Sequence, residues 1–215
     1  MTYDDLTNPV MGAYASFLSA LTGLYLGVTT PGMTVTPSTL ASVTAQAHQL
    51  AGTFISNAES GMFSYARKLG VERASDANAF SAVRVAVAQN IKTVLKKLRG
   101  QELGSAALLK NATGGMGLLV QSKLGQLDFR VSDNAGRLFD AQTLMRTTIR
   151  QFAIQTTIDA AVMKAEAAGK RSFTVDYPND PEHGGQGVEV PISGLGLAEA
   201  RRKIFHPNTS AVPHV

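Results

Sequence analysis

The chain has 215 residues, of which 44% are apolar and 17% charged, so it can bury a core and is not disordered as a whole. The absence of cysteine excludes disulfides, thiolate metal sites and cysteine nucleophiles. The formal net charge is +4, yet every Lys and Arg lies in residues 67–215, an asymmetry that predicts different surroundings for the two parts of the chain.

The first predicted helix is the uncharged stretch from Pro9 to Val28, with Thr7 or Asn8 as its cap. Its length is close to the roughly 20 residues of a membrane span. Its Thr, Ser and Gly content and the lack of flanking cations instead favour a helix packed against other helices, for example its own copies in a ring. Small residues recur along it, and we predict an assembly contact at Gly12, Ser16, Gly23 and Gly27.

Two amphipathic helices are expected next. The first begins at Thr36-Pro37-Ser38 and ends near Gly70, and it includes His48 as a residue of its polar face. The second has Ser75 as its cap and Gly100 as its stop.

The last turns of the second helix carry four cations, which are Lys92, Lys96, Lys97 and Arg99. Cations near a helix C-terminus offset the macrodipole, which is a sufficient structural explanation. The same four residues are candidate contacts for nucleic-acid phosphates, although no aromatic stacking platform accompanies them.

A glycine-rich joint at residues 112–128 is expected to divide the chain. Gly114-Gly115-x-Gly117 lacks the spacing of a phosphate-binding loop. The predicted architecture is therefore mainly α with a small β element: a helical region in 1–128 and a small α+β unit in 129–215.

Within the second unit, a turn at 133–136 precedes a helix of about seven turns that stops at Gly169. Arg146 and Arg150 lie four apart on one face of it, and we expect them to organise this unit together with Arg137 at the turn. Strands are predicted in 171–178 and 188–192, followed by a short helix before the tail.

Catalytic chemistry would have to use the late histidines. His183 stands beside Asp180 and Glu182, but its spacing matches no zinc signature, and "PISGLG" is not a nucleophile elbow. We therefore predict no catalysis, no metal and no cofactor, and we interpret His206-Pro207-Asn208 as a rigid turn that docks the tail.

The order of motifs in residues 130–210 resembles the C-terminal part of tailed-phage minor head proteins, which are similar to the phage Mu head-morphogenesis protein. The shared order is a Gly-Arg turn, a helix with "MRTTIR", a stretch ending "AEAAGK", a strand, an "HGG" loop and "FHPNTS". Thr209 stands where cysteine is common in the family, which puts a metal-clamped ending in doubt. The matching positions are Gly136, Arg137, Arg146, Thr147, Gly169, His183, Phe205, His206, Pro207 and Asn208.

The resemblance implies a structural component of a tailed-phage virion, assembled in the host cytoplasm. Such a minor head or portal-associated protein would act in head assembly or the head-tail connection. Its expected partners are portal or capsid proteins of the same virion, its own copies and packaged double-stranded DNA, but not a membrane. The alternatives are a nucleic-acid-binding protein, a membrane-active protein ejected with the phage genome, and a small hydrolase.

Overall fold

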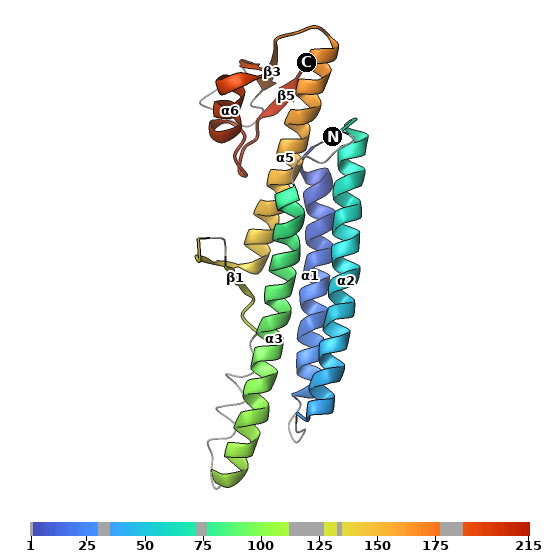
Figure 1. The fold of residues 1–215 in the computed structure, drawn as a ribbon, viewed down its shortest axis with the longest axis vertical. Helices are drawn as coiled ribbons and strands as arrows, with labels where there is room; N and C mark the ends of the chain where they lie inside the picture. Colours follow the sequence, from blue (N-terminus) through green and yellow to red (C-terminus); the bar gives the residue numbers. More distant parts are fainter. Residues whose placement is uncertain (1, 30–34, 72–76, 112–126, 133–134, 177–186) are drawn as a thin grey trace. The chain divides into compact units, whose positions relative to one another are not determined.

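The computed structural model describes residues 2–29, 35–71, 77–111, 127–132, 135–176 and 187–215 (Figure 1). Its helices are α1 (Asp4–Val28), α2 (Pro37–Lys68), α3 (Ala77–Asn111), α5 (Ala141–Ala167) and α6 (Gly194–Lys203). Its strands are β1 (Arg130–Ser132), β2 (Leu138–Asp140), β3 (Ser172–Asp176), β4 (Val188–Pro191) and β5 (Val212–His214). The predicted fold class, mainly α with a small β element, is confirmed.

The chain forms two compact units from interleaved segments. One contains residues 1–10, 59–80 and 146–215, and the other contains residues 11–58 and 81–145. Neither coincides with the predicted stretches 1–128 and 129–215.

Helix α1 begins earlier than predicted. The sequence placed Pro9 at the first helical position, but the helix starts at Asp4 and Pro9 lies inside it. The carbonyl of Tyr3 accepts hydrogen bonds from the backbone N–H and the hydroxyl of Thr7, which satisfies that fully buried threonine. Two acids in the first turn also offset the helix dipole, so the start is stable without the predicted cap.

Helix α2 has the predicted ends. The Thr36 hydroxyl accepts the Thr39 N–H at 3.1 Å, and Pro37 stands at the first helical position. At the other end Gly70 has φ +81°, and the Val71 N–H returns to the Ala66 carbonyl. A left-handed glycine with such a bond ends a helix.

Gly100 does not end α3, which continues to Asn111. The prediction was wrong because glycine stops a helix only when it takes a left-handed conformation, and Gly100 is not among the glycines with positive φ. In an ordinary helical conformation glycine costs only about 1 kcal/mol relative to alanine.

The unit of residues 11–58 and 81–145 has a core formed by α1, α2 and α3. Tyr14, Phe17 and Phe54 form an aromatic cluster with ring centroids 5.3–6.1 Å apart. The apolar faces of the two amphipathic helices are buried around it at Val43, Ala47, Val83, Val87, Ile91, Val94 and Leu98.

The same unit contains a β-hairpin that was not predicted. β1 and β2 pair antiparallel with Val131 opposite Phe139, on either side of the predicted turn. Gly136 has φ +77°, as a turn requires, while residues 133–134 of that turn lie outside the described residues.

The other unit packs α5, α6 and a three-stranded antiparallel sheet of order β4-β3-β5. β3 and β4 were predicted, and α5 ends as predicted before Gly169, which has φ +66°. β5 was not predicted. It pairs with β3, with Val175 opposite Pro213, so the C-terminal tail completes the sheet.

Candidate docking groove

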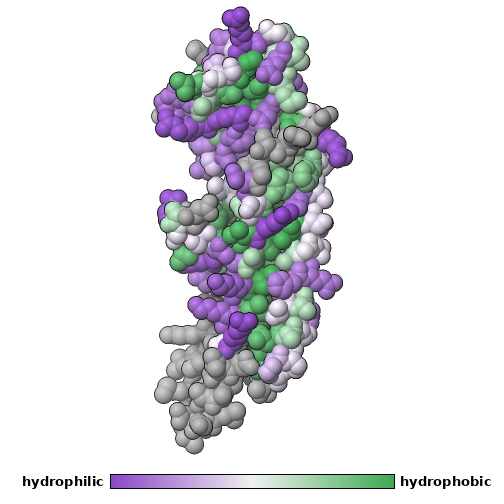
Figure 2. All heavy atoms as spheres, in the orientation of Figure 1, coloured by the Kyte–Doolittle hydropathy of each residue, from purple (hydrophilic) through white to green (hydrophobic). Residues whose placement is uncertain are grey.

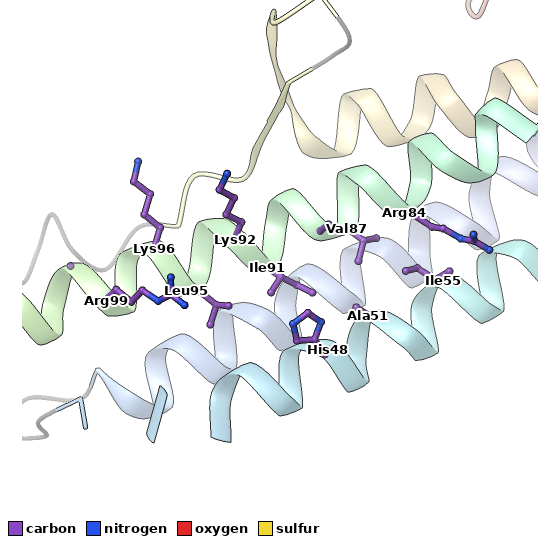
Figure 3. Close-up of a pocket in the computed structure, with 12 residues that line it drawn as sticks. His48, Ala51, Ile55, Arg84, Val87, Ile91, Lys92, Leu95, Lys96 and Arg99 are labelled. Atoms are coloured by element: carbon purple, nitrogen blue, oxygen red, sulfur yellow. The ribbon is translucent and has the colours of Figure 1, made fainter. Parts of the chain in front are cut away.

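An apolar groove runs between α2 and α3 within the unit of residues 11–58 and 81–145 (Figure 3). Its volume is about 690 Å³. Its floor is made of small and aliphatic side chains from both helices, which are Ala51, Ile55, Val87, Ala88, Ile91 and Leu95. In the close-up, Ile91 and Leu95 point from α3 toward the side of α2 that carries His48 and Ala51.

The floor follows from the helical repeat of both sequences. Val87, Ile91 and Leu95 are four apart on α3, so they form one row along the helix. Ala51 and Ile55 form the matching row on α2. Alanines at 51 and 88 leave room where longer side chains would fill the space between the helices.

Cations border this apolar floor. Arg84, Lys92, Lys96 and Arg99 line the groove from α3, and His48 lines it from α2. Lys92 and Lys96 extend outward from α3 in Figure 3. Figure 2 shows green apolar surface beside purple hydrophilic surface in the lower half of the view, above the grey atoms.

The segments that form the groove bring no acid to it. Residues 11–58 and 81–100 contain no Asp or Glu, and none lines the groove among the described residues. The groove therefore combines an apolar floor with an uninterrupted positive flank, which favours an amphipathic, acidic ligand.

Three of the four cations predicted to contact nucleic acid line this groove, namely Lys92, Lys96 and Arg99. Lys97 does not line it and is half-buried elsewhere on α3. Arg84 was not predicted, although its position eight residues before Lys92 already placed it near the same side of the helix. His48 was predicted only as a polar-face residue, and its side chain is exposed at the groove.

The predicted assembly ridge on α1 is exposed, and its Gly23 and Gly27 line a second pocket together with the first turns of α2. Gly12, Ser16, Gly23 and Gly27 are all exposed. A Cβ added to any of the three glycines would meet nothing within 4 Å, so close packing inside this chain does not require them. By length and composition α1 could also cross a membrane, with a mean hydropathy of 1.3 over its most apolar window, of which 39% is buried.

In the unit of residues 1–10, 59–80 and 146–215, Arg150 organises the C-terminal tail. One guanidinium nitrogen lies 2.8 Å from an Asp4 carboxylate oxygen, and another donates to the Thr209 carbonyl at 3.1 Å. The guanidinium also lies 5.6 Å from the centre of the Tyr3 ring, and the Tyr3 hydroxyl donates to the Ala211 carbonyl.

The other two arginines do not share this role. Arg146 is exposed, and Arg137 belongs to the other compact unit, where it lies over the Phe139 ring at 5.6 Å. The prediction that the three act together was therefore wrong. Arg201 was missed, although it pairs with Asp159 at 2.5 Å and links α6 to α5.

The tail turn forms as predicted. The Thr209 N–H donates to the His206 carbonyl at 2.9 Å across Pro207 and Asn208, and the Asn208 N–H donates to His206 Nδ1. Phe205, just before the turn, is fully buried against Phe173 with ring centroids 6.4 Å apart. The turn thus lies between two anchored segments.

The remaining histidine predictions are only partly covered. His183 lies outside the described residues, and His214 Nε2 lies 3.1 Å from Asp176. Within the described ranges, no cluster of three or more His, Asp or Glu could hold a metal ion.

Burial shifts the pKa of three tyrosines. Desolvation raises the pKa of Tyr14 to about 12, partly opposed by its hydrogen bond with Asn90. Burial likewise raises the pKa of Tyr3 and of Tyr65 above the ordinary value of 10.0. All three hydroxyls serve as neutral hydrogen-bonding groups in the core.

No family model, curated protein or solved structure matches this chain. The resemblance to phage minor head proteins therefore stays a prediction.

Proposed function

We propose that this chain is a structural component of a tailed-phage virion, a minor head or portal-associated protein that acts by docking a partner rather than by catalysis. The observation that carries the docking function is the α2–α3 groove, with its apolar floor and its positive flank. Apolar surface bordered by charge is a common form of protein-recognition site. The virion context rests on the motif order in residues 130–210.

Two further features support an assembly role. The exposed small-residue ridge of α1 offers a surface on which a second helix could approach closely. The C-terminal tail supplies β5 and completes the sheet of the unit of residues 1–10, 59–80 and 146–215. A sheet completed within the chain suits a subunit that keeps its shape while its helices bind partners.

The experiment is co-expression of the full chain with the portal and capsid proteins encoded in the same genome, followed by native mass spectrometry. We expect a complex of fixed stoichiometry and the chain as a constituent of purified particles. The variant Ala88→Tyr, which fills the groove from an exposed position, should abolish the complex.

The matched control is Ala82→Tyr, an exposed alanine of the same helix that does not line the groove. It should assemble like the native chain. Failure of the native chain to associate with any virion protein would contradict the proposal. Equal loss of assembly in both variants would show that the groove is not the contact.

The basic flank also favours one alternative, a nucleic-acid-binding function that uses Lys92, Lys96 and Arg99. Duplex DNA should then bind with an affinity that falls steeply with salt, because phosphate contacts release counterions. Binding of that kind, in the absence of any virion complex, would replace the assembly proposal.

A further inference from the structure

We propose that the α2–α3 groove takes an amphipathic helix of another protein, with aliphatic side chains on its inner face and acidic side chains along the flank next to α3. This inference rests on the proposed docking function and specifies the partner's chemistry. It commits to a helix of about four turns, since the groove-lining cations run from Arg84 to Arg99 and a helix rises about 1.5 Å per residue, or about 22 Å in all.

The shape of the floor favours a helix as the occupant. Val87 and Ile91 are buried at the bottom of the groove, whereas Leu95 and Ile55 are half-buried and Ala88 is exposed. These last three therefore supply the apolar surface against which the side chains of a neighbouring helix can pack. The alanines at 51 and 88 allow that neighbour to approach closely. An aliphatic stripe repeating every three to four residues would therefore match the floor.

The distribution of the cations along α3 favours a helix over a lipid as the occupant. A phospholipid concentrates its negative charge in one headgroup, whereas the cations of this groove are distributed along about four turns of α3. A helix with acids on one flank, spaced by three or four residues, can meet several of them at once. Its charge distribution is thus the complementary one.

The chemistry of the floor favours an amphipathic helix over a nucleic acid as the occupant. Binding of single strands relies on aromatic side chains that stack on bases, and the lining contains aliphatic residues and alanine, with His48 as its one ring among the described residues. Duplex DNA would contact the cations but leave the aliphatic floor unused. An amphipathic helix uses both.

The test employs a designed peptide of about 17 residues, with Leu at helical spacing and Glu along one flank, and a second peptide with Lys in place of Glu. Binding to the full chain is measured by fluorescence anisotropy. We expect the Glu peptide to bind at least about tenfold more tightly than the Lys peptide, and the difference to shrink in high salt.

The double variant Lys92→Glu/Lys96→Glu should weaken the Glu peptide by about tenfold and strengthen the Lys peptide. The matched control is Lys170→Glu/Arg171→Glu, which reverses two exposed charges that do not line the groove. It should leave both affinities within about twofold. Ala88→Tyr should block both peptides, because it occupies the floor.

Failure of the native chain to bind the Glu peptide, or equal affinity for both peptides, would overturn the inference. So would binding of phosphatidylglycerol vesicles or of duplex DNA that is lost in the Lys92→Glu/Lys96→Glu variant while the Glu peptide is ignored. A chain that enters particles but ignores the peptide refutes this inference alone. A chain that binds the peptide but no virion protein refutes the proposed function alone.

Discussion

Arg150→Ala should destabilise the full chain strongly, whereas Arg146→Ala should not. Both arginines lie on α5, one turn apart. Arg150 holds the Thr209 carbonyl, the Asp4 carboxylate and the face of Tyr3, while Arg146 is exposed. The two variants remove the same side chain from the same helix, so their difference isolates these contacts.

The magnitude follows from the three contacts of Arg150. Thr209 is 5% exposed, and loss of a charge-assisted hydrogen bond to a buried carbonyl costs about 1.5–3 kcal/mol. The side chains of Arg150 and Asp4 are 24% and 58% exposed, so solvent screens this ion pair and it contributes about 0–1 kcal/mol. The contact with the Tyr3 ring adds about 0.5–1 kcal/mol. Because one guanidinium serves all three, we expect a loss of about 2–4 kcal/mol in the free energy of unfolding.

Urea unfolding of the full chain, followed by circular dichroism, is the assay. Arg146→Ala should stay within about 0.5 kcal/mol of the native chain. Asp4→Ala removes only the exposed ion pair and should cost less than about 1 kcal/mol. An equal loss of stability in Arg146→Ala and Arg150→Ala, or an unchanged unfolding midpoint in Arg150→Ala, would contradict this role of Arg150.

Three further predictions concern α1, the buried tyrosines and the helix ends. Gly23→Leu should leave the monomer's free energy of unfolding within about 1 kcal/mol of the native value, since the space around Gly23 is open. It should impair self-association, measured by light scattering. Normal self-association of this variant would exclude the ridge as an assembly contact. Burial raises the pKa of Tyr14 to about 12, so its contribution to the free energy of unfolding is complete below pH 10.0 and is lost as the pH rises toward 12. The urea midpoint should therefore fall over that range, and it should fall less in Tyr14→Phe. An equal fall in both proteins would contradict the assignment of this pH dependence to Tyr14. Gly169→Ala should lower the free energy of unfolding by about 1–2 kcal/mol, because Gly169 has a left-handed φ of +66°. The control Gly52→Ala, inside α2, should raise it by about 0.5–1 kcal/mol. A change of the same sign for both variants in urea unfolding would contradict this prediction.

Local signals in the sequence were sufficient for most of the helices. The Thr36-Pro37 start of α2, the glycines at 70 and 169 and the three-to-four spacing of apolar residues act through contacts within a few residues. Signals of this kind act over a few residues, so they could be predicted without the tertiary structure. Gly100 is the exception, because it stays in a helical conformation and α3 continues past it. The β3 and β4 strands were found for the same reason, since alternation is a local pattern.

The remaining features depend on contacts between residues that are distant in the chain. β5 is three residues long and exists because β3 offers it an edge, a pairing across about forty residues that no local pattern encodes. Arg150 rather than Arg146 binds the C-terminal tail because of where Asp4 and Thr209 lie, at sequence separations of 146 and 59 residues from Arg150. The groove depends likewise on which faces α2 and α3 leave uncovered when they pack. The order of amino acids specifies which positions are apolar and which are basic, but these positions form one surface only because two helices remote in sequence pack together.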